Sequence, residues 1–368
     1  MPIFMDRHDV SDTVTAEIVA DLHQKDLKVQ HEFECRGLTY WFDGKRKTAF
    51  CLIEAPDKNA IVEMHSKAHG DVPHSIIEVE TSIVESFLGR IEDPKRAQDT
   101  GLNIINDTAF RIIMVVSLSK LSLTKKDSKL YKTTFSKFTS GIRKILKKYS
   151  GNIVKQTDYY YLASFNSVTK SVHAASDIQD LNREFNKQNT KEKLNLKIGL
   201  NAGVPVTKKQ LLFEDTIKLA ERMCDIIKGE ILVSAEAKEL YKSENANTFI
   251  KGKGIVSISQ TDEKFITILM DYIDAARTDA NLKVDNFSKP LGCSKSQFYR
   301  KMISLTGKSP NAFIQEYRLN EALKLLSKKA GNISEIAFQT GFSSPSYFSK
   351  CFKKKFVLLP VAYLNSLQ

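Results

Sequence analysis

Short apolar stretches alternate with amphipathic ones over the first 88 residues. Period-two patterns predict strands at 3–8, 29–35, 40–43, 48–54 and 76–79. Helical periodicity predicts a helix from about 13 to 23 and a second helix that follows Pro56 and stops at Gly70. The resulting order of strand, helix, strands, helix and strand is that of an α+β sandwich.

The same alternation returns in the middle of the chain. Strands are predicted at 111–118, 151–165 (a strand pair) and 194–202, and helices at 130–149, 171–188 and 215–227. Residues 89–106 are polar, contain Pro94 and lack periodicity, so they indicate a linker. A chain of 368 residues is long for one core. We therefore expect three domains, at 1–88, 108–258 and 262–368, the last of them purely helical.

Two helix–turn–helix patterns occupy the last hundred residues. In the first, Gly292 supplies the turn, Ser294 caps a new helix, and Phe298, Met302 and Leu305 form its buried stripe. The second has a helix at 333–340, a turn at Gly341 and a helix at 344–356. The residues expected to face a partner are Ser294, Lys295, Ser296, Gln297, Tyr299, Arg300, Ser344, Ser346, Tyr347, Lys350, Lys353 and Lys354.

Charge is distributed unevenly along the chain, whose formal net charge is +12. Residues 1–80 hold nine Lys or Arg against fifteen Asp or Glu, whereas residues 281–368 hold fourteen against four, a net +10. A basic C-terminal end indicates a polyanionic partner. Reading DNA requires donors at the start of a helix that fits the major groove, and cations that bind phosphates. Two such helices joined by 310–329 are expected to enter successive major-groove segments roughly 34 Å apart.

The C-terminal region closely resembles the AraC/XylS family of bacterial transcription regulators. The matching stretches are Ser-Pro-Asn-Ala-Phe-Ile-Gln-Glu-Tyr-Arg-Leu and its continuation, at 309–326, and Ile-Ser-Glu-Ile-Ala-Phe-Gln-Thr-Gly-Phe and its continuation, at 333–356. The chain departs from the pattern at Val357, where the family has glycine, and at Phe287 and Ser288, which replace Leu-Ala. The resemblance implies double-stranded promoter DNA as partner, and we expect RNA polymerase as a further one.

Residues 111–235 resemble the class III nucleotide cyclase catalytic domain in outline. The resemblance rests on Gly151-Asn-Ile-Val-Lys-Gln-Thr, on Leu196-Lys-Ile-Gly-Leu-Asn-Ala-Gly and on Ile217-Lys-Leu-Ala-Glu-Arg-Met. Such a cyclase needs two aspartates for two divalent ions. Those positions hold Ser117 and Tyr159, with Asp158 adjacent on the opposite strand face.

The position resembling the family's transition-state asparagine holds Lys218, and its arginine is retained as Arg222. Arg222 either keeps a family role or is a solvated helix residue. We expect a degenerate domain that senses a ligand or forms a homodimer, and no catalytic residues; an active nucleotide cyclase with a regulatory DNA-binding domain is the alternative.

Six of the seven histidines lie in the first 74 residues. His65 and His69 are spaced i, i+4 on the second predicted helix, so both imidazoles project from one face and can chelate one transition metal. Cys51 and Glu54 add ligands only if they reach that face. With Tyr40-Trp41 and 50–56, these motifs and His8 resemble a small family of ferredoxin-like domains described as nickel-binding. The resemblance implies that His65 and His69, with His8, hold a transition metal such as nickel.

Five scattered cysteines indicate a reducing compartment, and no run approaches about 18 apolar residues. We expect a cytoplasmic, multidomain α+β regulator. It would combine a ferredoxin-like α/β sandwich, a cyclase-like α/β domain and an all-α double helix–turn–helix domain. A metal carrier or storage protein is a further alternative, but it gives no reason for the basic C-terminal end.

Overall fold

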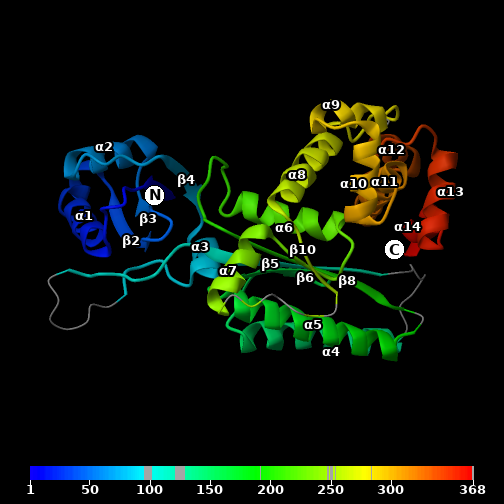
Figure 1. Cartoon of the computed structure of the whole chain (residues 1–368), viewed down its shortest axis with the longest axis horizontal. Helices are drawn as coiled ribbons and strands as arrows, with labels where there is room; N and C mark the ends of the chain where they lie inside the picture. Colours follow the sequence, from blue (N-terminus) through cyan, green and yellow to red (C-terminus); the bar gives the residue numbers. More distant parts are fainter. Residues whose placement is uncertain are drawn as a thin grey trace.

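Three groups of elements follow one another in the computed structural model, which describes residues 1–94, 102–120, 129–190, 192–246, 248, 252, 254–282 and 284–366 (Figure 1). Part of the predicted linker, at 95–101, lies outside these described residues. None of the described helices is both long and apolar enough to cross a membrane.

The first group is a four-stranded sheet in the order β2-β3-β1-β4, with every neighbouring pair antiparallel. Its elements are β1 (Ile3–Asp9), α1 (Ala16–Val29), β2 (Arg36–Asp43), β3 (Thr48–Glu54), α2 (Lys58–Ala68), β4 (Ser75–Val79) and α3 (Thr81–Leu88). The predicted strand at 29–35 is wrong. Val29 ends α1, and Gln30–Phe33 continue as a 3-10 turn, because the Gln30 side chain accepts a hydrogen bond from the Gly37 N–H at 2.7 Å.

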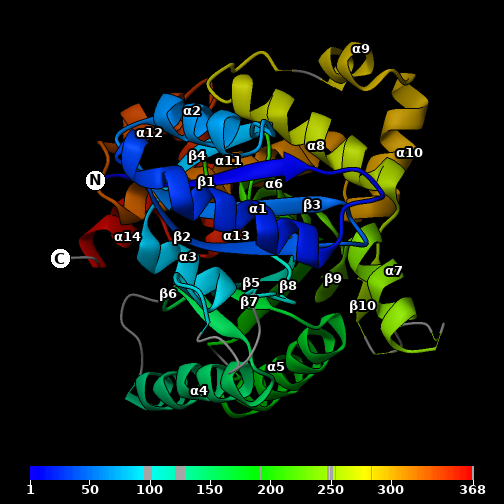
Figure 2. The same ribbon diagram turned by 90° about the vertical axis from the view of Figure 1, so that its left-hand side faces the viewer.

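The second group is a six-stranded sheet in the order β10-β9-β8-β5-β7-β6. Its elements are β5 (Arg111–Lys120), α4 (Lys129–Lys148), β6 (Asn152–Thr157), β7 (Tyr160–Phe165), α5 (Val168–Gln188), β8 (Leu194–Gly203), α6 (Glu214–Ile226), β9 (Ile231–Val233), α7 (Ala235–Glu244) and β10 (Ile255–Ser257). Strand β5 alternates its side chains: Ile112 and Met114 pack beneath α4 and α5, whereas Ile113 and Val115 pack beneath α6. Figure 2, turned by 90°, shows α4 and α5 together below the sheet.

The N-terminal sheet is buried on both faces. Phe50 and Leu52 of β3 face the middle domain, whereas Cys51 and Ile53 face α1 and α2. Helix α3 joins the two sheets, and the Phe87 ring lies 4.9 Å from that of Phe213. One continuous apolar core therefore links the first two groups of elements.

The C-terminal group is entirely helical among its described residues. It comprises α8 (Gln260–Ala275), a 3-10 turn (Val284–Phe287), α9 (Ser288–Leu291), α10 (Lys295–Thr306), α11 (Pro310–Ser327), α12 (Ile333–Gln339), α13 (Pro345–Phe356) and α14 (Pro360–Ser366). Buried Ile266 and Leu269 of α8 belong to the same core as Ala220 and Met223 of α6. The predicted multidomain α+β class with a helical C-terminus is confirmed.

Candidate nucleic-acid interface and metal centre

The first helix–turn–helix unit consists of α9, a turn at Gly292 and α10. Gly292 adopts φ +59°, a left-handed conformation that favours glycine. The Ser294 hydroxyl accepts a hydrogen bond from the Gln297 N–H, and Gln297 Oε1 accepts one from the Ser294 N–H at 2.9 Å. Two backbone N–H groups at the N-terminus of α10 are thus satisfied by side chains. The Phe298 ring is buried and stacks at 5.2 Å on Phe287. Phe287, which departs from the family pattern, thus fills the core beneath α10.

The predicted partner-facing residues of α10 are exposed, but Lys295 and Gln297 also make contacts within the chain. Lys295, Ser296, Tyr299 and Arg300 are exposed. Lys295 also lies 2.6 Å from Asp285, an exposed ion pair that is worth little in water. Gln297 is exposed but its oxygen caps the helix, which leaves its amide N–H groups to donate outward. Arg300 has no ion pair within the described residues, and its guanidinium can therefore donate to a partner.

The second unit repeats the arrangement with α12, Gly341 and α13. The Ser344 hydroxyl accepts from the Tyr347 N–H at 3.2 Å, and three phenylalanines of α13 are buried. The exposed residues are Ser346, Tyr347, Lys350, Lys353 and Lys354, whereas Ser344 is half-buried at the cap. The Tyr347 hydroxyl accepts from Gln315 Nε2 of α11 at 3.0 Å, which fixes its ring on the surface.

Helix α11 connects the two units rigidly. Its eighteen residues begin with Pro310 in the first turn after the Ser309 cap. Phe313 and Ile314 are buried with the first unit, whereas Leu319 and Leu326 are buried with the second. The two exposed basic helices therefore keep a fixed relation to each other, which is what reading two segments of one duplex requires.

The N-terminal domain brings three histidines together between β1 and α2. His65 Nε2 lies 3.0 Å from Asp6 Oδ2, and His65 Nδ1 lies 3.1 Å from Asp26 Oδ1. His69 Nε2 lies 3.2 Å from the same Asp26 oxygen, and His8 Nε2 lies 3.5 Å from Asp6 Oδ2. Two sets of donors, each within 4.8 Å, result: Asp6, His8 and Cys51, and Asp26, His65 and His69.

The carboxylates control protonation in this cluster. Burial lowers the pKa of His65, but hydrogen bonds to Asp26 and Asp6 outweigh burial and raise that pKa to about 10. Burial raises the pKa of Asp6, but the His8 charge and hydrogen bonds to His65 and His8 hold it well below its usual range. Burial also raises the pKa of the Cys51 thiol. Without a metal, His65 is therefore an imidazolium between two carboxylates.

His8, His65 and His69, which the resemblance named as metal ligands, lie side by side in the structure, whereas neither aspartate was predicted. Asp6 precedes His8 by two residues on β1, so the pleat of the strand puts both side chains on one face, a signal that the sequence did offer. Asp26 comes from α1, whose register against α2 is set by tertiary packing. Cys51 reaches the cluster, whereas Glu54 pairs with Arg36 and the chain terminus instead.

The cyclase-like positions of the middle domain are used for other contacts. Ser117 pairs with Tyr160 and Lys197 in the sheet. Asp158 lies exposed in the turn between β6 and β7, not on a strand face as predicted. Tyr159 packs 5.2 Å from the Phe135 ring.

Arg222 is only 5% exposed, so of the two interpretations that the sequence left open, the solvated helix residue is wrong. It forms an ion pair with Asp271 and lies 3.5 Å from Asp274, while Lys218 lies 3.5 Å from Asp271. Both acidic partners belong to α8. The two cations of α6 therefore fasten the C-terminal helices to the middle domain.

Comparisons with known proteins find family matches for the two ends of the chain. Residues 287–366 match a family described as a helix-turn-helix domain, and residues 4–79 match the family of the nickel responsive protein SCO4226-like. A histidine kinase P4 of Formosa agariphila is 40% identical over 110 residues, covering 30% of this chain and 8% of that protein. The HTH-type transcriptional regulator MtrA of Neisseria gonorrhoeae is 29% identical over 102 residues, covering 28% of this chain and 33% of that protein.

Among solved structures, the catalytic core of a rhodopsin-guanylyl cyclase with converted specificity matches at 22% identity and a TM-score of 0.31, covering 37% of this chain and 83% of that one. The chain spans a third or less of the length of the two curated relatives named above. Residues 287–366 therefore form a helix–turn–helix domain, and residues 4–79 are similar to the SCO4226-like family, as the resemblances predicted.

Proposed function

We propose that this chain is a sequence-specific transcription regulator of the AraC type that binds double-stranded promoter DNA. The observation that carries the proposal is the pair of capped helices, α10 and α13, which α11 holds together with their polar and basic residues exposed. Their N-terminal ends present backbone N–H groups and side-chain donors, and the later turns of α13 present Lys350, Lys353 and Lys354. Donors of the first kind suit base edges, and cations of the second kind suit phosphates.

Individual roles follow from position on the two helices. Arg300 lies in the second turn of α10, and its guanidinium forms no ion pair with any described residue, so we assign it to bidentate contact with a base edge. Lys353 lies in the last turn of α13, so we assign it to a phosphate. Ser294, Lys295, Ser296, Gln297 and Tyr299 would complete the first contact surface, and Ser344, Ser346, Tyr347, Lys350 and Lys354 the second.

The histidine cluster is proposed to bind nickel or a similar transition metal. Its donors are imidazole nitrogens, carboxylate oxygens and one thiol, which suit borderline divalent ions. His8 Nε2 is buried, and its contact with Asp6 Oδ2 is long, at 3.5 Å, so this nitrogen is well placed to bind a metal ion instead. His8, His65 and His69 would hold the metal, with Asp6, Asp26 and Cys51 as nearby donors. A bound cation would replace a proton of His65, which lies between Asp6 and Asp26. Metal binding would thereby change the charge and the hydrogen bonds of the cluster, and we propose that this change is the signal.

A nucleotide cyclase is the less favoured candidate. The two metal positions hold Ser117 and Tyr159, which offer no carboxylate, and Arg222 is engaged with α8. Two-metal chemistry needs both carboxylates. We infer that the middle domain links signal and DNA binding, as part of a homodimer that recruits RNA polymerase to DNA in the cytoplasm.

We also propose domain boundaries at 1–88, 108–258 and 262–368. Because buried residues of α8 share a core with α6, DNA binding is best tested on the full chain.

The experiment is selection of bound duplexes from a randomised library by the full chain, at several salt concentrations. We expect a motif of two blocks about one helical turn apart, with an affinity that falls steeply with salt. Retention of DNA without sequence enrichment would refute sequence-specific regulation while leaving a basic, non-specific surface.

A further inference from the structure

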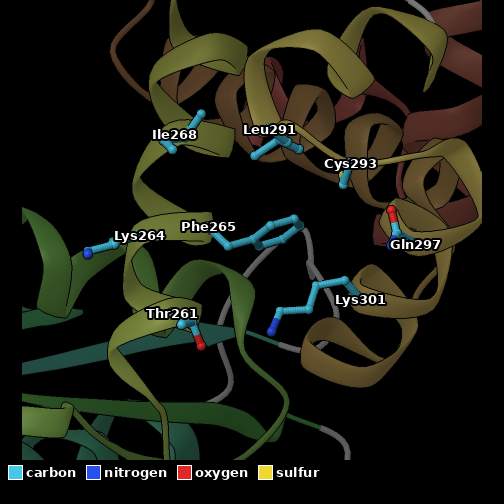
Figure 3. Close-up of a pocket in the computed structure, with 8 residues that line it drawn as sticks. All are labelled: Thr261, Lys264, Phe265, Ile268, Leu291, Cys293, Gln297 and Lys301. Atoms are coloured by element: carbon cyan, nitrogen blue, oxygen red, sulfur yellow. The ribbon is translucent and has the colours of Figure 1, made fainter.

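A pocket of about 360 Å³ lies between α8 and the first helix–turn–helix unit (Figure 3). Helix α8 lines one side, and the opposite side consists of the end of α9, the following turn and α10. Its volume falls in the range of pockets that bind small molecules, roughly 300–1,000 Å³. No residue of this pocket takes part in the histidine cluster.

The walls of the pocket combine an apolar body with one cationic end. Phe265, Ile268 and Leu291 are large apolar residues of the lining, and Ile268 is 42% exposed, which is high for an isoleucine. Figure 3 shows Phe265 reaching from α8 towards α10, with the Lys301 side chain extending back below it. The Lys301 ammonium lies 5.9 Å from the centre of the Phe265 ring. An apolar group placed here would bury surface that now faces water.

The charges around the pocket select the charge of a ligand. Two lysines line it, Lys264 and Lys301, and one carboxylate outside the lining, Asp262, forms an ion pair with Lys301. These three groups sum to one positive charge, and since Figure 3 shows Lys264 directed away from Phe265, Lys301 is the cation that would meet a single ligand carboxylate. An ammonium has three donors, so Lys301 can serve Asp262 and a ligand together. The Thr261 hydroxyl, at the same end, is a further donor.

We propose that this pocket is a regulatory binding site for a small amphipathic monocarboxylate, with its aromatic or short alkyl body against Phe265 and Ile268 and its carboxylate at Lys301. Lys301 follows Arg300 on α10, the helix assigned to base reading. A carboxylate there lowers the positive potential of the helix that approaches DNA phosphates.

Ligand binding therefore weakens DNA binding, and DNA weakens ligand binding by the same factor. This regulatory step rests on the proposed function, whereas ligand binding itself does not.

The site is tested on the full chain with benzoate and octanoate as probes, and with benzyl alcohol and benzylamine as neutral and cationic counterparts of benzoate. Binding is measured by ligand-observed NMR without DNA. We expect the carboxylates to bind at least tenfold more tightly than the alcohol or the amine. The site would be overturned if benzyl alcohol bound as tightly as benzoate, or if neither carboxylate bound at about 10 mM.

Two variants locate the binding. Ile268→Glu places a carboxylate in the pocket and is expected to weaken benzoate binding at least tenfold. Ile303→Glu is the matched control, because Ile303 lies on α10 with the same 42% exposure but does not line the pocket. Equal losses in the two variants would place the binding elsewhere.

The cysteines give a second readout in the unaltered protein. Cys293 lines the pocket and Cys351 does not, and both are partly exposed, whereas the other three cysteines are buried. Saturating benzoate should slow alkylation of Cys293 by iodoacetamide at least threefold and leave Cys351 unchanged. Equal rates at Cys293 with and without ligand would contradict the proposal.

The regulatory step is then measured as the affinity for the selected duplex with and without benzoate. An at least threefold loss of affinity supports it, and an unchanged or increased affinity refutes it. If the chain selects no DNA sequence, the proposed function fails, while the NMR and alkylation results still decide whether the pocket binds carboxylates.

Discussion

The end of α13 stores backbone strain that a single substitution should release. Val357 caps this helix with φ 65° and ψ 1°, and its N–H donates to the Lys353 carbonyl at 2.9 Å. A β-branched residue in the left-handed region costs about 1–2 kcal/mol. Its side chain is 72% exposed, so its removal sacrifices little packing. Glycine adds roughly 0.5–1 kcal/mol of lost chain entropy. Val357→Gly should therefore raise the free energy of unfolding by about 0.5–1 kcal/mol.

The assay is thermal unfolding of the full chain without DNA or added metal, where this gain corresponds to about 2 °C in Tm. Amide exchange in α13 and α14 should slow in parallel, because these helices share a buried cluster around Phe352 and Phe356. Val361→Gly, on the exposed face of α14, is the control and should lower stability by about 0.5 kcal/mol. A loss of stability in Val357→Gly equal to that of the control would refute the strain.

Three further predictions concern the other sites. Lys353→Ala should weaken binding to all duplexes alike and reduce the slope of log affinity against log salt concentration by about 1. Arg300→Ala should cost about 1–3 kcal/mol of binding free energy on the selected duplex and relax the sequence preference. Equal, sequence-independent losses in both variants would disprove the assignment of Arg300 to a base. His65→Ala should lower the nickel affinity measured by calorimetry at least tenfold. His31→Ala, which changes an exposed histidine outside the cluster, should leave that affinity unchanged. Similar losses in both variants would exclude the histidine cluster as the nickel site. Arg222→Met should leave Asp271 without its main partner and loosen α8, seen as faster amide exchange there, and unchanged exchange would show that the ion pairs fasten nothing.

Local patterns predicted the elements better than the contacts between them. The cap at Ser294 and the turns at Gly292 and Gly341 depend on residues close in sequence, so the sequence predicted them directly. The strand predicted at 29–35 failed for a tertiary reason. Val29 and Phe33 do pack on the apolar core, but they do so from a helical turn, since apolar spacing alone does not distinguish the two over so short a stretch.

Residue spacing alone predicted neighbouring site residues only where one element carries them, whereas His8 was named through a family resemblance. His65 and His69 share a helix, so their proximity follows from the i, i+4 spacing. Asp26, from α1, and the role of Arg222 depend on which helices meet, and nothing in the sequence gives that information. The pocket between α8 and α10 is likewise formed by two separate segments, and so was invisible to the patterns.

The most direct test of the central claim is a spacing measurement on the selected duplex. If α11 holds α10 and α13 in adjacent major-groove segments, the two blocks of the selected duplex lie on one face of the DNA. Inserting 5 base pairs between the blocks, about half a helical turn, moves one block to the opposite face. We predict at least a tenfold loss of affinity for the full chain, because one helix must leave its base contacts. Equal affinity for the original and the 5-base-pair duplex would contradict reading of DNA by two rigidly coupled helices.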